Sequence, residues 1–265
     1  MLYQVTDWDD AYANSIHIAN ADLLIQDFAE ASAAFRAAYP PQPLGSGSLY
    51  LPPAPAKGLA VFIHGGFWHE PYPDLWSHLA AGAFAHDWAV AVPTYRLAPD
   101  ATIAGMVAEV AAAIIYAARH VEGPIALSGH SAGGQLATRM VCADGTLPDE
   151  IYQRVISCVP ISGLADLRPL LRTKMNDVLQ LDDAEARSQS PAFLTPRTRV
   201  PVTCWVGGAE RPEFLRQSAL LANIWAGMGV QTECVIEPGR NHFDILNGMT
   251  QPDSPLTRTL LGLNR

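Results

Sequence analysis

Short apolar runs alternate along the chain with longer stretches in which apolar residues recur every three or four positions. The runs are apolar throughout rather than at every second position, which is typical of parallel strands covered on both faces. We expect strands over residues 59–63, 88–92, 124–127, 155–160, 202–206 and 231–236, with a further short strand over 48–51.

Helical periodicity fills most of the stretches between these runs. The stretch 102–121 is apolar on almost every side, which suits a helix in a central layer of the fold. We expect helices over residues 22–38, 74–85, 102–121, 131–142, 212–227 and 254–263. The alternation of strands and helices predicts an α/β fold, with a mostly parallel central sheet and helices on both faces.

The length of 265 residues, without an internal repeat or an interdomain linker, favours a single domain over residues 1–265. Within it we expect residues 1–44 to form a helical cover. The irregular stretch 164–200 is expected to form short helices that cap the edge of the sheet. An ordinary long crossover connection explains this stretch equally well.

The composition describes a well-buried, acidic protein, because 49% of the residues are hydrophobic, 16% are charged and the formal net charge is −9. This acidic balance argues against nucleic acid and anionic membranes as partners. The first ten residues lack both regions of a secretory signal. Four widely spaced cysteines suit small buried side chains in a reducing compartment. We therefore expect a cytoplasmic protein that acts on a small molecule and whose apolar surface would permit a homodimer.

A nucleophile motif follows the strand expected at 124–127. Residues 129–133 read GHSAG, which fits the pattern G-x-S-x-G, and a helical pattern comes next. In serine hydrolases a strand–turn–helix context holds this serine on a strained turn, and the flanking glycines leave room for it. We therefore expect Ser131 to be a nucleophile. The alternative is a chance match in a glycine-rich loop, against which the flanking strand and helix argue.

A serine nucleophile needs a base, and the base needs an acid that orients it. In the α/β-hydrolase fold these groups follow in the order serine, acid, histidine. His242 lies after the strand at 231–236 and is the only histidine beyond His130. Glu210 directly follows the strand at 202–206, so we favour it as the acid. The alternatives are Glu213, at the start of a helix where a carboxylate has a structural role, and the less suitable Asp166, Asp183 and Asp244.

A second motif follows the strand at 59–63, where residues 64–68 read HGGFW. Glycines let backbone N–H groups approach the oxygen that becomes negative in a tetrahedral intermediate. We expect Gly65 or Gly66, together with the amide of Ala132, to form an oxyanion hole. His64 is expected to fix this loop by hydrogen bonds.

Aromatic residues cluster beside this loop and suit an apolar substrate pocket. Phe67 and Trp68, together with His130 of the serine motif, are the predicted pocket residues. Tyr72 and Trp76 are further candidates, and packing in the core is the alternative for each of these aromatic side chains. No P-loop or dinucleotide-binding glycine motif occurs in a suitable context, and no cysteine pair has metal-ligand spacing, so we expect neither a cofactor nor a metal.

Together these motifs resemble the esterase/lipase branch of the α/β-hydrolases, which is related to hormone-sensitive lipase. Kynurenine formamidases (arylformamidases) are more similar still, on the segments ISGLADL at 161–167, SP at 190–191, ERPEF at 210–214, RQS at 216–218 and HFD at 242–244. The resemblance covers residues 58–246 and implies hydrolysis of a formamide or a small ester, with N-formylkynurenine as the family substrate.

Two features depart from the family pattern. Glu210 stands where the family usually has aspartate. The stretch before His64 is also short, so the sheet is expected to lack an N-terminal edge strand. Three functions remain open: a formamidase, a short-chain carboxylesterase or thioesterase with the same chemistry, and a ligand-binding protein of the hydrolase fold without catalysis.

Overall fold

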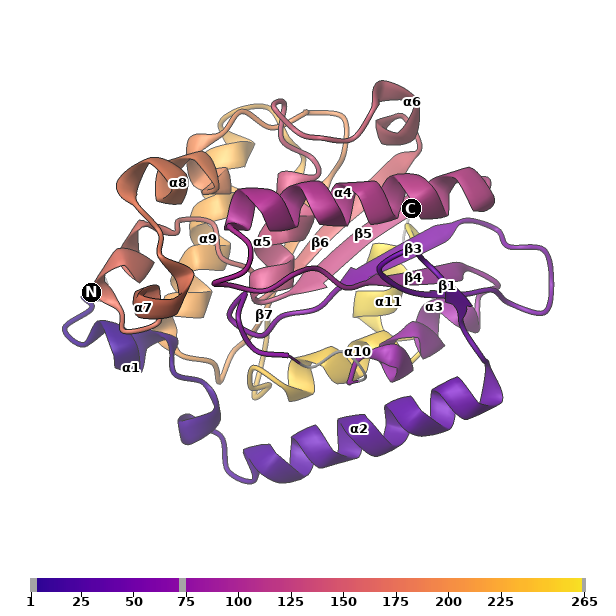
Figure 1. The fold of residues 1–265 in the computed structure, drawn as a ribbon, viewed down its shortest axis with the longest axis horizontal. Helices are drawn as coiled ribbons and strands as arrows, with labels where there is room; N and C mark the ends of the chain where they lie inside the picture. Colours follow the sequence, from indigo (N-terminus) through magenta and orange to yellow (C-terminus); the bar gives the residue numbers. More distant parts are fainter. Residues whose placement is uncertain (1–3, 72–74, 264–265) are drawn as a thin grey trace.

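A single eight-stranded sheet forms the centre of the computed structural model, which describes residues 4–71 and 75–263 (Figure 1). The strand order is β1-β2-β4-β3-β5-β6-β7-β8, and every neighbouring pair from β4 to β8 is parallel. The strands are β1 (Gln42–Pro43), β2 (Gly47–Tyr50), β3 (Leu59–Ile63), β4 (Ala89–Pro93), β5 (Ile125–His130), β6 (Val155–Ile161), β7 (Val202–Gly207) and β8 (Thr232–Glu237).

The mostly parallel sheet predicted from the apolar runs is confirmed, and each predicted run corresponds to one of the strands β2 to β8. The short stretch before His64 predicts a sheet without an N-terminal edge strand, and this prediction is wrong because β1 and β2 form that edge. β1 spans two residues and pairs antiparallel with β2, which itself pairs antiparallel with β4.

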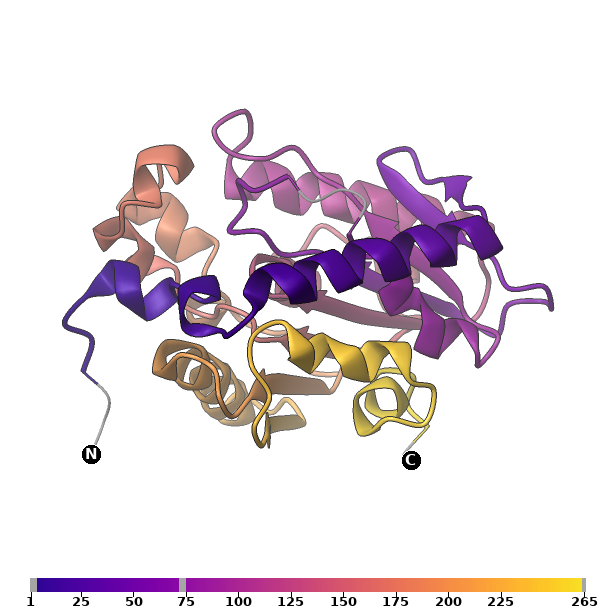
Figure 2. The same ribbon diagram turned by 90° about the horizontal axis from the view of Figure 1, so that it is seen from below.

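Helices cover both faces of the sheet, as Figures 1 and 2 show. One face carries α4 (Ile103–His120), α5 (Ala132–Arg139) and α9 (Pro212–Ala226). The other carries α3 (Ala81–Phe84), α10 (Asn247–Thr250) and α11 (Pro255–Leu260), with α2 (Ala21–Ala38) packed outside them. The remaining helices are α1 (Trp8–Tyr12), α6 (Asp149–Tyr152), α7 (Asn176–Leu179) and α8 (Asp183–Ser188).

Each strand divides its side chains between two apolar cores, because successive residues point to opposite faces. In β3, Leu59, Val61 and Ile63 face the core beneath α4, α5 and α9. Ala60 and Phe62 face the core beneath α2, α3, α10 and α11. All five are at most 2% exposed, so both faces of the sheet centre are closed to water.

α4 is less enclosed than its composition predicts. Its buried side includes Met106, Val110 and Ile114, whereas Tyr116 is 43% exposed. The helix therefore lies in an outer layer rather than in a central one. Among the described helices it is the one long and apolar enough to cross a membrane, but half of it is buried against the rest of the protein, as in a core helix.

The helix expected over 74–85 is wrong as a continuous element. Of its residues, 74 lies outside the described part, and the others contribute a 3₁₀ turn, η2 (Ser77–Ala80), followed by α3. The hydroxyl of Ser32 in α2 accepts a hydrogen bond from the amide of His78 (3.2 Å) and also contacts its ring Nδ1 (2.8 Å). The contact with α2 therefore takes up backbone that a continuous helix would use internally.

Residues 164–200 form the connection between the parallel neighbours β6 and β7. The segment contains η3 (Arg168–Arg172), α7, α8 and η4 (Pro191–Phe193), and these pack against α1, α5 and α9. Topologically it is a crossover, and Figure 1 shows its helices beside α1 at one end of the sheet.

Candidate active site

Ser131 occupies the sharp turn between β5 and α5. Its φ of 54° and ψ of −118° lie in a region that residues with side chains rarely adopt. The turn is fixed by a hydrogen bond from its amide to the carbonyl of Ile161 (2.8 Å). A Cβ atom on Gly133 would lie 2.0 Å from the carbonyl oxygen of Ile63, so the turn requires glycine there.

His242 and Glu210 come from two neighbouring loops and form a buried pair. Nδ1 of His242 lies 2.6 Å from Oε2 of Glu210, and the glutamate side chain is fully buried. An ionised carboxylate only accepts hydrogen bonds, so Nδ1 is the donor and Nε2 is left for another partner. Oε1 of Glu210 accepts from the hydroxyl of Ser162 (2.6 Å) and the amide of Gly207 (2.7 Å). The carboxylate is therefore held by three donors.

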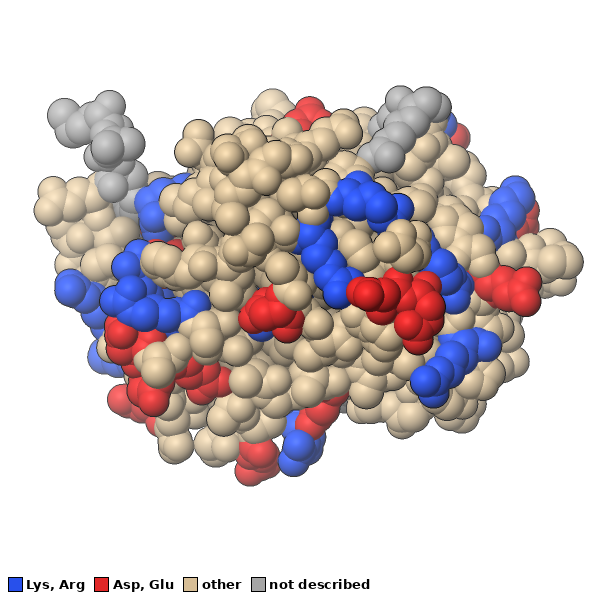
Figure 3. Space-filling view, turned by 90° about the horizontal axis from the view of Figure 1, so that it is seen from above, with Lys and Arg blue, Asp and Glu red and all other residues tan. Residues whose placement is uncertain are grey.

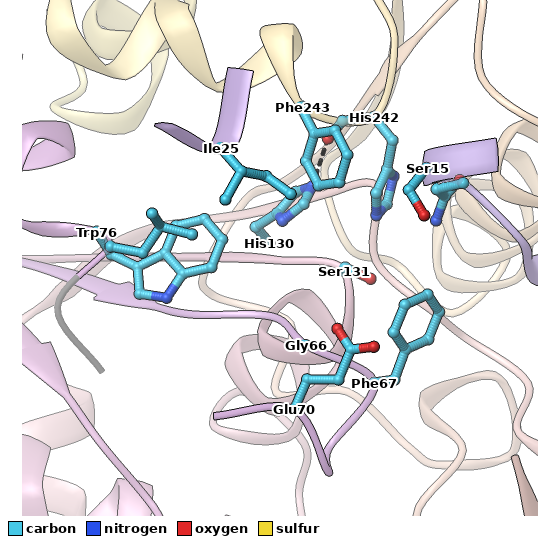
Figure 4. Close-up of a pocket in the computed structure, with 12 residues that line it drawn as sticks. Ser15, Ile25, Gly66, Phe67, Glu70, Trp76, His130, Ser131, His242 and Phe243 are labelled. Atoms are coloured by element: carbon cyan, nitrogen blue, oxygen red, sulfur yellow. Dashed lines mark hydrogen bonds between the residues drawn. The ribbon is translucent and has the colours of Figure 1, made fainter. Parts of the chain in front are cut away.

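Ser131 and His242 line the same cavity, which has a volume of about 90 Å³. Figure 4 shows the His242 ring directed toward Ser131. No hydrogen bond joins the two side chains among those the structure shows for the described residues. Catalytic hydrogen bonds are often long before substrate binds and tighten in the complex. The geometry thus brings together the serine, histidine and carboxylate that the sequence predicts.

The other carboxylates considered as the acid have partners elsewhere. These partners are Tyr12, Arg216 and Gln217 for Glu213, Arg168 for Asp166, Arg187 for Asp183 and the amide of Asn241 for Asp244. Glu210 is therefore the only one of these five carboxylates that the structure hydrogen-bonds to His242.

The loop after β3 runs directly against the serine turn. A Cβ atom on Gly65 would lie 2.8 Å from the carbonyl oxygen of His130 and 3.1 Å from Cβ of Ser131. Gly66 has a φ of 109°, which favours glycine. Ala132 is the first residue of α5, and the first amides of a helix have no partner within it. Gly66 also lines the same cavity as Ser131, so all three predicted oxyanion residues lie close to the serine.

His64 holds this loop in place, as the sequence predicts. Its carbonyl accepts a hydrogen bond from the hydroxyl of Tyr95 (2.8 Å), and its ring Nδ1 contacts the carbonyl of Gly65 (2.7 Å). Burial lowers the pKa of His64, so the ring is neutral at pH 7. The ring also stacks on that of Tyr95, with centroids 4.5 Å apart, and a neutral, stacked ring is suited to support rather than to proton transfer.

His130 links the serine turn to the base. Its Nε2 lies 2.8 Å from the carbonyl of His242, and the two rings are 4.4 Å apart. A carbonyl only accepts, so Nε2 carries the hydrogen. Burial, and next the proximity of His242, lower the pKa of His130 well below its usual value. His130 is therefore a neutral donor that holds the backbone of His242 while its ring lines the cavity.

Of the predicted pocket residues, Phe67 and His130 line the cavity, and Trp68 does not. Trp68 has a φ of 60°, is 1% exposed and donates from Nε1 to the side chain of Gln135 (3.2 Å). The backbone turn therefore directs its indole into the core. Trp76 does line the cavity, and Tyr72 lies outside the described residues.

Several lining residues were not predicted from the sequence. Asn14, Ser15 and Ile25 come from the N-terminal segment, Glu70 from the loop after β3, and Phe243 from the histidine loop. The N-terminal residues carry no motif, and only their place in the fold brings them to the cavity. Ser162, which donates to Glu210, had one usable signal, namely a hydroxyl at the end of a strand next to β7.

The cysteines of the chain are unpaired, and Cys142, Cys158 and Cys204 are buried. Burial raises the pKa of the Cys142 thiol to about 11, so it stays protonated at neutral pH. Within residues 4–71 and 75–263, no group of three His, Cys, Asp or Glu side chains is arranged to hold a metal ion.

Known proteins resemble the chain in sequence and in structure. Residues 60–245 match the family described as alpha/beta hydrolase fold. The kynurenine formamidase of Danio rerio is 29% identical over 225 residues, which is 80% of this chain and 75% of that protein. The kynurenine formamidase of Drosophila melanogaster is 25% identical over 215 residues, covering 76% of this chain and 71% of that protein.

Among solved structures, a candidate thioesterase from Silicibacter sp. superimposes with a TM-score of 0.90 at 38% identity, covering 96% of this chain and 99% of that chain. An esterase/lipase from an uncultured bacterium shares the fold, with a TM-score of 0.65 at 21% identity, covering 82% of this chain and 80% of that chain. The resemblance predicted from the motifs is therefore confirmed: the chain belongs to the alpha/beta hydrolase fold family and is a hydrolase of the arylformamidase-like or esterase-like kind.

Proposed function

We propose that the protein is a serine hydrolase that removes a small acyl group from a formamide or short-chain ester, with N-formylkynurenine as the best candidate substrate. The observation that carries the proposal is the 2.6 Å hydrogen bond between the buried Glu210 and His242, which lines the same cavity as Ser131. The similarity to kynurenine formamidases supports the choice of substrate.

The proposed reaction proceeds in two halves. Nε2 of His242 takes the proton from Ser131 as Oγ attacks the carbonyl carbon, and Glu210 stabilises the charged ring. His242 then gives this proton to the leaving nitrogen or oxygen, which departs and leaves an acyl ester on Ser131. In the second half His242 takes a proton from water, the resulting hydroxide attacks the ester, and the acid product leaves as Ser131 regains its proton.

Backbone amides stabilise the negative oxygen in both halves. The amides of Ala132 and of Gly65 or Gly66 are suited to this role, because their residues adjoin Ser131. Such donors are fixed before the reaction and need no reorganisation as charge develops. The macrodipole of α5, whose first residue is Ala132, adds to the stabilisation of negative charge.

The size of the cavity favours a small acyl group. Typical pockets for drug-sized ligands measure roughly 300–1,000 Å³, whereas the space in front of Ser131 measures about 90 Å³. A formyl or acetyl group fits this space, and a long acyl chain would require the N-terminal segment to move. The cavity therefore supports a formamidase or short-chain esterase over a lipase.

A thioesterase is the second candidate, because the Silicibacter structure at 38% identity is described as a candidate thioesterase. Coenzyme A carries phosphates, which require available cations. Within the connection between β6 and β7, Arg168 pairs with Asp166, Arg187 pairs with Asp183, and the guanidinium of Arg172 lies over the ring of Trp8. On the face that Figure 3 shows, blue and red side chains are intermixed at this end of the molecule, so this face has no broad basic surface for such a ligand.

The test is a Ser131→Ala variant together with a turnover panel of N-formylkynurenine, short p-nitrophenyl esters and an acyl-coenzyme A. Loss of a triad serine typically costs about 10⁶-fold in rate, so turnover of the favoured substrate should become undetectable while circular dichroism stays unchanged. A fluorophosphonate probe should label Ser131 in the wild type. Retained turnover in the variant would refute the proposal, and a wild type without an adduct would support a non-catalytic ligand-binding protein.

A further inference from the structure

A carboxylate lies in the cavity in front of the nucleophile. Among the described residues that line this cavity, Glu70 is the only one with a carboxylate, ammonium or guanidinium group. Figure 4 shows its carboxylate directed toward Ser131 and beside Phe67. The reaction proposed above gives Glu70 no part, because Glu210 already serves as the acid. A charge at this position acts on whatever substrate binds.

The backbone fixes Glu70 relative to the oxyanion loop. The carbonyl of Gly66 accepts hydrogen bonds from the amide of Glu70 (2.8 Å) and from that of His69 (3.0 Å). The backbone of Glu70 is therefore one tight turn away from Gly66, a predicted oxyanion residue. Within the described part of the chain, no ion pair or hydrogen bond engages this carboxylate, so its charge remains available to a ligand.

Glu70 also lies at the boundary between two hollows. A second hollow, of about 180 Å³, shares Phe67 and Glu70 with the active-site cavity and extends past Asp9 and Tyr12. A substrate with its acyl carbon at Ser131 has room for its leaving group in this direction. Asp9 already accepts a hydrogen bond from the amide of Lys174 (2.7 Å), so Glu70 is the carboxylate left for the ligand.

The ring of Phe67 lies beside the Glu70 carboxylate, and Trp76 and Phe243 line the same cavity farther from it. Phe67 lines both hollows, so its flat ring can stack on an aromatic leaving group, and the carboxylate beside it attracts a cation and repels an anion. We infer that Glu70 is a specificity-determining residue, which pairs with an ammonium group carried by the aromatic leaving group of the substrate. The inference rests on the proposed function and narrows its substrate class to aryl formamides or esters whose leaving group carries an ammonium group.

The test uses three phenyl acetates with the same ester and a para arm of the same length. The arm ends in an ammonium in 4-(2-aminoethyl)phenyl acetate, a hydroxyl in 4-(2-hydroxyethyl)phenyl acetate and a carboxylate in 3-(4-acetoxyphenyl)propanoate. We expect kcat/KM to fall in this order for the wild type, with about fivefold per step, the scale of a partly exposed ion pair. The preference should shrink in about 0.5 M NaCl, because salt screens it.

The Glu70→Gln variant should bring the three values within about twofold of one another, through a loss on the ammonium ester and a gain on the carboxylate ester. Glu150→Gln is the matched control, since it removes the same charge from the exposed surface of α6 and should keep the wild-type order. An equal loss on all three esters in Glu70→Gln, or a wild type without charge preference, would overturn the inference. Neither result touches the proposed function, which is tested separately by the turnover of Ser131→Ala and by the fluorophosphonate adduct on the wild type.

Discussion

At the scale of single residues, the site depends on side chains whose directions are imposed by their backbone. Ser131 has a φ of 54° between two glycines, and Glu210 is held by Ser162 and the amide of Gly207. Groups with a strained backbone or fully hydrogen-bonded side chains rearrange only at a large cost in free energy. The geometry before substrate binds is therefore already close to the geometry that the proposed reaction needs.

Replacing Glu210 by Gln tests the role of its charge. The amide is nearly the same size, but it cannot accept from Nδ1 and stabilise a charged ring in the same way, so we expect kcat to fall by about 10³–10⁴-fold. Steady-state kinetics on the best substrate of the panel measures the loss. Glu233→Gln, on the exposed side of β8, is the control and should keep wild-type turnover. A loss below about tenfold in Glu210→Gln would contradict its assignment.

The sequence predicts those residues of the candidate site that belong to short motifs at the ends of strands. Ser131, His242 and the two loop glycines are of this kind. The burial of the Trp68 side chain away from the cavity was not predictable, because its direction follows from a positive φ that no sequence motif indicates. Glu70 and Asn14 were missed for a related reason, since their part in the cavity depends on how separate segments pack.

At the scale of elements, the N-terminal segment is attached to the wall of the site. The hydroxyl of Tyr12 in α1 donates to Glu213 in α9 (2.8 Å), and Asp10 pairs with Arg211. The ring of Phe214 packs against those of Tyr12 and His242. Residues 14 and 15 follow α1 directly and line the cavity. The contacts that fix α1 therefore also fix this part of the substrate pocket.

Tyr12→Phe should therefore affect stability and binding together. Burial and the neighbouring Glu213 raise the pKa of Tyr12, so its hydroxyl is a neutral donor at any accessible pH. Losing a buried partner of a charged group costs about 1–3 kcal/mol, and KM should rise while kcat changes little. Urea unfolding and steady-state kinetics measure the two effects. Tyr116→Phe, at an exposed position of α4, should change neither. An unchanged unfolding midpoint in Tyr12→Phe would show that this contact is not stabilising.

The elements themselves were predictable in proportion to the strength of their patterns. The strands from β3 to β7 follow mostly apolar runs and the long helices follow clear periodicity, whereas β8 reads TECVIE and is only partly apolar. The two-residue β1 and the five-residue α1 are too short to show a repeating pattern of apolar residues, so the sequence does not predict them. Whether residues 164–200 act as a cap stays a prediction, because none of them lines the cavity of Ser131 in this structure.

At the scale of the whole molecule, buried neutral histidines make stability depend on pH. Burial lowers the pKa of His78 to about 4, and it also lowers the pKa values of His64 and His130. An unfolded histidine titrates near its ordinary value of about 6.5. Between these pH values the unfolded chain binds protons that the folded protein does not bind, so stability falls as the pH drops from about 6.5 toward 4.

A His78→Gln variant should flatten this dependence. The wild type should lose about 1 kcal/mol per pH unit through this residue between about pH 6 and pH 4.5, and the variant should lack that share even if it is less stable at pH 7. Urea unfolding of both proteins at about pH 7 and pH 5 gives the comparison. Parallel curves for the two proteins would show that His78 does not titrate as its burial implies.

The residues that line the cavity from the N-terminal segment belong to a different part of the chain from those proposed to perform the chemistry. Ser131, Glu210 and His242 lie in loops that follow parallel strands, whereas Asn14, Ser15 and Ile25 line the cavity from the N-terminal segment, between the end of α1 and the first turns of α2. The proposed catalytic residues and these pocket residues therefore lie in separate segments of the chain. Variant libraries confined to positions 14, 15 and 25 could retune which molecules this hydrolase accepts without rebuilding the machinery that cleaves them.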